Sequence, residues 1–445
     1  MALTKNNDFT KLLPKHTFLF LATVCVALCF IYAKADNKND FDVFLDAAVR
    51  LQRLENIYQP PFIYNLQYFY SPLFALLLIP FSYFSFKTIG VIWLLLNTFL
   101  LLRTWNIFEY YLDKTKLSPK GHLVLIILSF AVVSRFIFFN YERVQMTIFL
   151  LWAMMESSYQ IFQGRKLAGA LLLAFAINIK VLPLVMIPYL VYRAEFKASI
   201  YTFSALLTYL FVPALILGWE YNLFLLKEWW AIINPTQPTH IIEDDLGAYG
   251  LVPALSTLLI ETEPLFAIKR NLFSLEYEQV YWIINAFRIV LILLTLYFLR
   301  TLPFKKASSR LHLFYELSYI CLIIPLIFPH QRRYSFYFIF PAVTYLIYFL
   351  LVNYDKYFPR LRQYSKFIGL IITFVISTTF LIFIRRRVLG SETITLMIYF
   401  HIITWATLLL IPALLFANPN SLMPPIIVKN SSPPIGMKKH DLVST

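Results

Sequence analysis

The sequence predicts an all-α, polytopic membrane protein, and three observations support this fold class. Of its 445 residues, 59% are hydrophobic and only 14% are charged. The mean hydropathy is +0.66, well above that of a water-soluble domain of this length. Apolar runs of roughly 20 residues, the length that crosses a bilayer, recur along most of the chain. This composition excludes an ordinary soluble enzyme.

Each candidate membrane span is an apolar run between short polar breaks. The stretch 167–193 is too long for one ordinary helix and too short for two, and Lys180 and Pro183 interrupt it. It predicts either a broken span or a re-entrant pair. Counted as one span, it brings the total to about 12 transmembrane helices. The other runs cover 15–33, 71–86, 88–106, 121–139, 146–162, 199–218, 279–299, 312–328, 334–352, 367–385 and 393–416.

The formal net charge of +15 could suggest a nucleic-acid partner. Cytoplasmic loops of membrane proteins collect Lys and Arg, so the charge is better explained by topology, and no nucleic acid is expected. Basic residues before the first run, in 300–310, in 353–366 and near the end predict that both termini lie inside. The count of about 12 then leaves the basic loops 114–120 and 165–166 outside. A re-entrant 167–193 would correct these loops but break the parity at the N-terminus.

The chain is expected to form one transmembrane domain over residues 1–420, followed by a flexible cytoplasmic tail, 421–445. The segments 34–70 and 219–278 are expected outside. The three cysteines lie in apolar runs without the spacing of metal ligands, so neither a metal site nor a disulfide is predicted. No cofactor is predicted, and a divalent cation at the acidic stretch 243–245 is left open.

The stretch "DFDVFLDAAVRLQRL", residues 40–54, predicts an amphipathic helix lying along the membrane surface in the first external loop. Its apolar residues follow one another at spacings of three and four, as on one helix face. Asp40, Asp42 and Asp46 could be its solvated face and N-cap. They could equally supply a carboxylate to a site at the membrane exit.

Two basic features could meet an anion. Lys180 lies in an apolar segment, where a lysine usually faces protein or a water-filled cavity; pairing with a buried carboxylate and binding of a phosphate are both open. The sequence "PHQRRY", 329–334, falls outside in every topology considered. Its His330, Arg332 and Arg333 therefore depart from the positive-inside trend, which suits an anionic headgroup or a reacting phosphate.

Four short motifs, in order, resemble glycosyltransferase family 87, the polyprenol-phosphate-mannose-dependent mannosyltransferases of GT-C architecture. The first is the Asp-Phe opening with "IYQPP" and "YFYSPLFALLLIP". It is followed by "NYERVQMTIFLLW", by "AFAINIKVLPLVMIPYLVYR" with its Lys-x-x-Pro, and by "FPHQRRYSFYFIFPA". One departure is Val144–Gln145, where family members often carry Gly-Gln. The last hundred residues carry no matching motif.

The resemblance implies an inverting transfer of a hexose, with mannose expected, from a polyprenyl-phosphate sugar. The acceptor would be a glycolipid, polysaccharide or other glycan on the extracytoplasmic side of the cell membrane. It implies that Asp40 is the general base, with Asp42 as second choice. It further assigns the donor phosphate to Lys180, His330, Arg332 and Arg333. Gln145 and Asn140, in a short polar connection, and Tyr70 are candidates for contacts to sugar or acceptor, although the ordinary polarity of a hairpin explains the connection just as well. The rival interpretation is a transporter or flippase of lipid-linked sugars, since broken helices with a charge at mid-membrane suit transporters too.

Overall fold

The computed structural model describes residues 28–35, 40–235, 237, 240, 243, 245–261, 266, 268–299, 303–358, 365–383 and 390–419, and most of them are helical. Within these ranges no β-strand forms, and the one strand-like contact is an isolated bridge between Tyr249 and Gln331. The predicted all-α class is confirmed. The predicted tail 421–445 and most of the predicted span 15–33 lie outside the described residues.

Six helices of the described part are long and apolar enough to cross a membrane. A seventh candidate joins α18 (Ser391–Tyr399) to α19 (Ile402–Leu408) and α20 (Leu410–Phe416), bent by 59°. These lengths and compositions indicate a membrane protein, as predicted. The six are α4 (Phe86–Tyr111), α5 (Pro119–Glu142), α9 (Phe196–Phe211) continued by α10 (Ala214–Leu217), α13 (Tyr277–Leu299), α14 (Arg310–Ile327) and η7 (Arg333–Ile339) continued by α15 (Phe340–Tyr357).

The helix α14 and the segment η7–α15 are the most buried of the six, and α9 and α13 are the most exposed. In each of the first two 83% of the apolar window is buried, against 17% for α9 with α10 and 22% for α13. The exposed helices turn Phe, Leu and Ile side chains outward, as helices solvated by lipid do. A stacked pair of rings, Phe298 on α13 and Tyr319 on α14 with centroids 3.8 Å apart, joins an exposed helix to a buried one.

The segment 167–193 folds back on itself. The helix α7 (Lys166–Ile179) ends at Lys180, and η5 (Leu182–Val185) and α8 (Met186–Tyr192) then return the chain. The two ends of the segment meet, because Lys166 Nζ lies 2.6 Å from Glu195 Oε2. A segment whose ends touch does not cross a membrane. Of the two predicted alternatives the structure favours the re-entrant pair, and the count of about 12 transmembrane helices is not confirmed.

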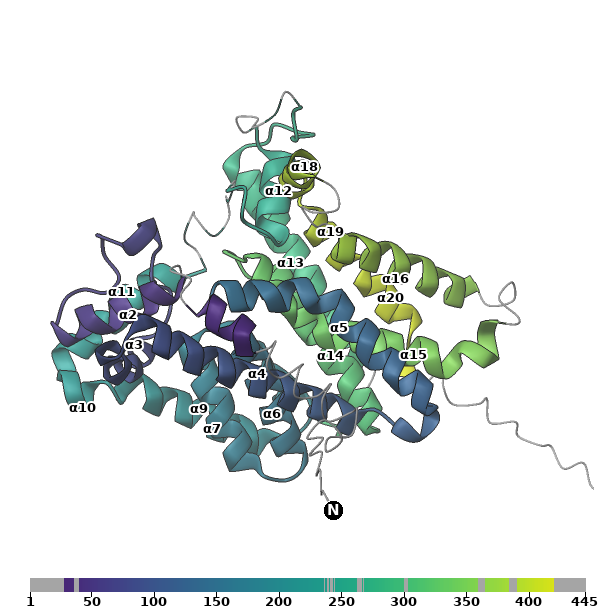
Figure 1. Cartoon of the computed structure of the whole chain (residues 1–445), viewed down its shortest axis with the longest axis horizontal. Helices are drawn as coiled ribbons and strands as arrows, with labels where there is room; N and C mark the ends of the chain where they lie inside the picture. The colour runs from purple at the N-terminus through teal and green to yellow at the C-terminus, as the bar shows by residue number, and fades with distance from the viewer. Residues whose placement is uncertain are drawn as a thin grey trace, which may run out of the picture.

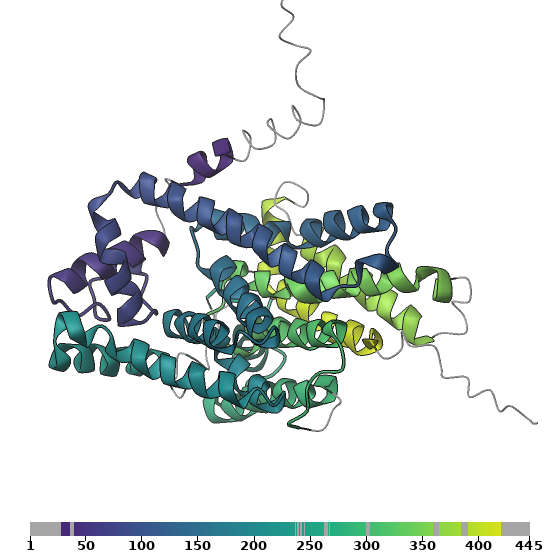
Figure 2. The ribbon, with the colours of Figure 1, turned by 90° about the horizontal axis from the view of Figure 1, so that it is seen from below.

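The predicted span 71–86 also needs correction. It consists of α3 (Pro72–Leu78) and η3 (Ile79–Tyr83), which together rise only about 20 Å, whereas the hydrocarbon core is about 30 Å thick. Both pieces pack against α2 (Asp40–Gln52). In both views α2 and α3 (purple) lie beside α11 (Trp219–Ile233, teal) at the same end of the molecule (Figures 1 and 2). The hydropathy of the sequence identifies this apolar run, but it does not show that the run folds into helices too short to cross the hydrocarbon core.

A helix does form over the first acidic stretch. In α2 the side chains of Phe41, Phe44, Ala48 and Leu51 are buried. The helix ends earlier than the predicted stretch 40–54. Leu54 lies beyond its last residue, with a φ of 57°, and is 60% exposed. The buried face packs inward on α3 and η3. The position of α2 along a membrane surface stays a prediction.

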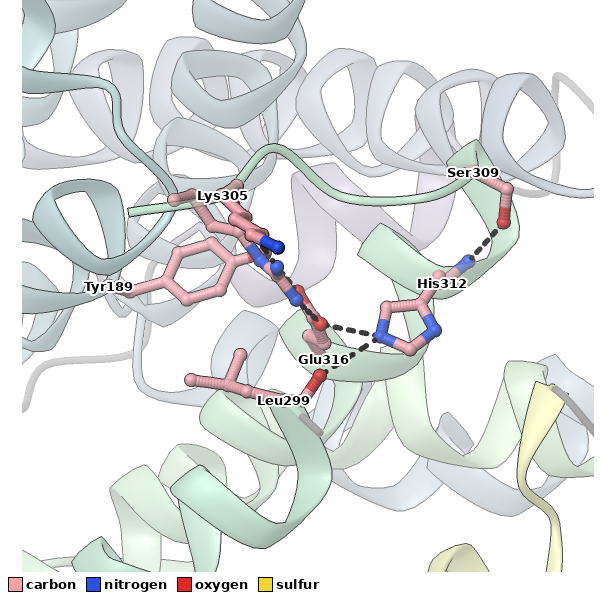
Figure 3. Close-up of polar contacts among 7 residues, drawn as sticks. Tyr189, Leu299, Lys305, Ser309, His312 and Glu316 are labelled. Atoms are coloured by element: carbon pink, nitrogen blue, oxygen red, sulfur yellow. Dashed lines mark hydrogen bonds and ion pairs between the residues drawn. The ribbon is translucent and has the colours of Figure 1, made fainter. Parts of the chain in front are cut away.

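A buried ion pair joins the re-entrant segment to α14 (Figure 3). Arg193, the residue after α8, donates from Nε to Glu316 Oε2 at 2.9 Å and from Nη2 to the other oxygen, and both side chains are fully buried. The hydroxyl of Tyr189 donates to Oε2 at 2.8 Å, and His312 Nε2 lies 2.8 Å from Oε1. A buried charge is tolerated when it is paired and hydrogen-bonded in this way.

Candidate active site

A cavity of about 1430 Å³ brings together most of the site residues that the sequence predicts. They come from α2, from the loop before α3, from the connection between α5 and α6 (Thr147–Phe162), from the re-entrant turn and from the loop 329–334. Two of the predicted residues, Asp42 and Asn140, do not line it. The predicted residues that do are Asp40, Tyr70, Gln145, Lys180, His330, Arg332 and Arg333.

Asp40 is the first residue of α2, and its side chain is 20% exposed. Gln145 donates a hydrogen bond from Nε2 to Asp40 Oδ2, and Arg143 Nη1 lies 3.8 Å from Oδ1. Burial raises the pKa of the Asp40 carboxyl above its usual 3.8. The nearby charges of Arg143, Lys180 and Arg332 and the Gln145 hydrogen bond pull this pKa the other way. The carboxylate is thus positioned to accept a proton inside the cavity.

Asp42, the second choice for the base, makes its hydrogen bond away from the cavity. It accepts from the hydroxyl of Tyr64 at 3.0 Å on the exposed side of α2. Asp46, one turn further along the helix, does not line the cavity either. Of the three aspartates in this stretch, only Asp40 faces the cavity.

Lys180 reaches the cavity at the turn between α7 and η5. Its ammonium has no hydrogen-bond or ion-pair partner among the described residues. Nζ lies 5.6 Å from the centroid of the Tyr70 ring, which the ammonium faces. The alternative of a buried structural carboxylate partner finds no support within this part of the chain. Lys180 therefore brings a positive charge without a directly contacting carboxylate to the same space as Asp40.

His330 is held by residues of the segment 219–278, which the sequence predicts to be external. Glu243 accepts from the backbone N–H of His330 at 3.2 Å, and its other oxygen lies 3.2 Å from His330 Nδ1. The His330 ring packs beside Phe69, with centroids 5.4 Å apart, and against His240 at 4.9 Å. These contacts hold one edge of the imidazole and present the rest of the ring to the cavity.

The two arginines of the same loop are held differently. Arg332 Nη2 lies 2.6 Å from Asp245 Oδ2, whereas Arg333 donates from Nε to the Tyr249 hydroxyl at 2.7 Å. Gly247 makes room for Arg332, because a Cβ there would stand 2.5 Å from Nη1. The Tyr249 N–H donates to the Gln331 carbonyl at 2.8 Å. The acidic stretch that the sequence left open for a cation thus supplies Glu243 and Asp245 as partners of the basic loop.

No group of three or more His, Cys, Asp or Glu side chains gathers as metal ligands within the described part of the chain, and Asp244 lies outside it. The absence of a metal or cofactor stays a prediction.

Asn140 lies behind the cavity and donates from Nδ2 to the Phe136 carbonyl at 2.8 Å and to the Tyr334 carbonyl at 3.1 Å. It holds the end of α5 against the basic loop, and its predicted contact with sugar has no support in the cavity lining.

The departure at Val144 has a structural counterpart. Val144 has a φ of 49°, in the left-handed region that favours glycine and that a β-branched residue seldom adopts. This conformation turns the chain sharply after α5, so that Gln145 can reach Asp40. The family's usual Gly-Gln pair suits the same turn without strain.

The cavity opens on an apolar side. The residues at this opening, from η5, α11 and α13, both line the cavity and are 40–64% exposed; they are Leu184, Trp230, Trp282, Ile289 and Ile292. The sequence analysis gives none of these residues a role, and it gives none to Arg288, a cavity-lining arginine on α13. A charged residue inside an apolar span was a signal that could have found Arg288.

The fold and the cavity define a multi-helix membrane protein with a charged site that opens among lipid-facing side chains. The model of Glycosyltransferase family 87 matches residues 68–329, which is more than half of the chain. The chain therefore belongs to this family and is a membrane glycosyltransferase, and the predicted resemblance is confirmed. No curated protein and no solved structure matches. Asp40 and the residues from His330 to Arg333 lie outside the matched stretch, so their assignment depends on the geometry.

Proposed function

We propose that the protein transfers a hexose, mannose in the first instance, from a polyprenyl-phosphate sugar to a glycan or glycolipid hydroxyl on the extracytoplasmic side. The observation that carries this proposal is the single cavity in which the Asp40 carboxylate and the Lys180 ammonium share a space with an apolar opening. A substrate with a charged head and a prenyl tail suits such a cavity. Membership of a glycosyltransferase family favours an enzyme over the rival transporter.

The proposed reaction is one inverting displacement. Asp40 takes the proton of the acceptor hydroxyl as its oxygen attacks the anomeric carbon. The bond from that carbon to the phosphate oxygen breaks, and polyprenyl phosphate leaves with the bonding electrons. Lys180 and the arginines of the loop 329–334 stabilise the developing phosphate charge. Gln145 and Arg143 hold the Asp40 carboxylate in place.

We also propose a topology of ten crossings within a single transmembrane domain. Removing 71–86 and treating 167–193 as re-entrant takes two spans from the predicted twelve. Parity is kept, so both termini stay inside. A second cavity, of about 480 Å³, supports this, because it brings Lys114 and Lys116 together with Ser308–Arg310 of the predicted inside loop. The basic loops 114–120 and 165–166 then also lie inside, in agreement with the positive-inside rule.

The proposed function is tested with purified protein in vesicles, given polyprenyl-phosphate mannose labelled in the sugar and a membrane lipid extract as acceptor source. We expect release of polyprenyl phosphate matched by label in a new glycan, with the anomeric configuration inverted. Vesicles without the extract provide the control for hydrolysis. Other hexoses on the same lipid carrier test the choice of sugar. Absence of transfer with every hexose donor would contradict the proposal.

A further inference from the structure

Arg288 is a cation in the middle of an apolar helix. It lies midway between Tyr277 and Leu299 on α13, one of the candidate membrane spans. A charged side chain at such a position is costly unless it faces protein or a water-filled cavity, and it marks a functional site. Arg288 lines the main cavity. The reaction proposed above gives it no role.

The contacts of Arg288 leave its charge uncompensated. Its Nη1 donates to Asn285 Oδ1 at 3.1 Å and its Nη2 to the His240 carbonyl at 3.3 Å, and both acceptors are neutral. Its Nε is buried without a hydrogen-bond partner in the described part of the chain. In that same part no carboxylate lies within ion-pair distance of Arg288. By contrast, Arg143 and Arg332 on the same cavity each contact an aspartate.

The surroundings of Arg288 indicate the kind of molecule that would carry the missing anion. Tyr281, Asn285, Arg288 and Ile292 line the cavity from one face of α13, over about 16 Å of helix. Beyond Arg288 the lining is apolar, and Ile292 is 51% exposed at the opening. An anion bound at Arg288 would thus have an apolar path beside it on which a hydrocarbon chain can lie.

The charge cluster around the reacting carboxylate is a separate group. The cations that act on Asp40 are Arg143, Lys180 and Arg332, and Arg288 is not among them. Arg288 is instead tied to the backbone of His240. A phosphate that binds Arg288 would lie beside His240, whose ring packs against that of His330, and not among the three cations that act on Asp40.

We propose that Arg288 and Asn285 form a second subsite in the cavity, which binds the phosphate group of a membrane lipid whose hydrocarbon chain lies along α13. The guanidinium carries a fork of donors that match phosphate oxygens, and its buried Nε–H has no partner in the described part of the chain. The lipid is either the polyprenyl-phosphate donor on its way in or out, or an acceptor lipid that carries a phosphate. This subsite rests on the proposed function, but its binding step can be measured without turnover.

The test uses the full-length protein in a phosphate-free detergent and the variants Arg288→Gln and Arg288→Lys. Direct binding of short-chain polyprenyl phosphate is measured first. Then KM is measured for the mannose donor in hydrolysis, for a phosphate-bearing acceptor glycolipid and for a neutral alkyl mannoside. Loss of one charged hydrogen bond should weaken the affected step about tenfold or more in Arg288→Gln, with partial recovery in Arg288→Lys. Arg310→Gln, at the far end of α14, is the control, and thermal unfolding checks that each variant is folded.

Weaker polyprenyl phosphate binding with a raised donor KM would identify the donor as the source of the phosphate. A raised KM confined to the phosphate-bearing acceptor would identify the acceptor. Either result supports the subsite. Wild-type values in all four measurements, or an equal loss with the neutral mannoside, would overturn it and leave Arg288 as a support for the His240 loop. Wild-type protein that binds polyprenyl phosphate but transfers no sugar would count against the proposed function and not against the subsite.

Discussion

Of the three aspartates Asp40, Asp42 and Asp46, only Asp40 lines the cavity. Asp40→Asn keeps the shape of the side chain and removes its capacity to accept a proton. General base catalysis contributes about 10²–10⁴-fold, so transfer should fall by at least that factor without loss of folded protein. Asp42→Asn and Asp46→Asn are matched controls and should stay near the wild-type rate. Full activity of Asp40→Asn, measured as polyprenyl phosphate release, would show that Asp40 is not the general base.

The surroundings of Asp40 also set a pH dependence. Burial raises the pKa of its carboxyl, and the base acts only when it is ionised. The value of kcat/KM should therefore fall as the pH drops through a pKa above 3.8. Arg143→Gln removes a positive charge that lowers this pKa, so the acid limb should move to higher pH. Arg103→Gln, whose partner is Glu156, should leave the limb in place. An unshifted limb in Arg143→Gln would show that another group titrates.

Lys180 and Arg332 should differ in how much they contribute to donor use. Lys180 makes no ion pair within 4 Å in the described part of the chain, whereas Asp245 already offsets part of the Arg332 charge. Loss of a charged hydrogen bond to phosphate costs about 1.5–3 kcal/mol, or roughly ten- to a hundred-fold in donor kcat/KM. Lys180→Met should reach this range, and Arg332→Gln should cost the same or less. Unchanged donor kinetics in both variants would place the phosphate elsewhere.

At the scale of elements, the contact between α8 and α14 depends on the buried pair of Arg193 and Glu316. Glu316→Ala leaves the Arg193 charge buried without its carboxylate, which typically costs about 3–5 kcal/mol. Thermal unfolding in detergent should show a clearly lowered Tm. The double variant Arg193→Met, Glu316→Leu replaces the pair with apolar side chains of similar size and should recover most of the loss. A single variant as stable as the wild type would contradict this account of the contact.

The elements also show where pattern reasoning fails. Periodicity over residues 40–54 gave the helix α2 and four of its buried residues, but the end of the helix depended on the positive φ of Leu54. Hydropathy found the run at 71–86 without knowing that α3 and η3 are too short to cross. The reversal in 167–193 is fixed by the pairing of Lys166 with Glu195, which no local window contains.

At the scale of the whole molecule, the topology of ten crossings can be tested with single cysteines in a variant without the native ones. Residues 116, 165 and 305 should react only with membrane-permeant reagents in intact cells, and residues 45 and 331 also with impermeant ones. The side of residue 165 decides between the models, because only the count of about 12 puts it outside. Labelling of residue 165 from outside would restore the longer count, and residues 45 and 331 on opposite sides would exclude a shared site.

Much of the candidate site could be predicted because the ordered motifs name residue types at fixed positions. Seven of those residues meet in one cavity, although they are far apart in the chain. The apolar opening and Arg288 could not be predicted in the same way, because they depend on which face of α13 turns inward. Asn140 shows the opposite error: its motif suggested substrate, while its amide binds the Tyr334 carbonyl.

The pair of Arg193 and Glu316 also has a consequence for the order of events during synthesis. The two residues are 123 positions apart, so at about 5–20 residues per second Glu316 is made roughly 6–25 s after Arg193. During that interval the hairpin 166–195 has a guanidinium at its base without its carboxylate. The hairpin can pack against its final neighbour only when α14 has been inserted. The contact between this hairpin and α14 therefore forms only after Glu316 has been made, although the hairpin's own residues leave the ribosome early.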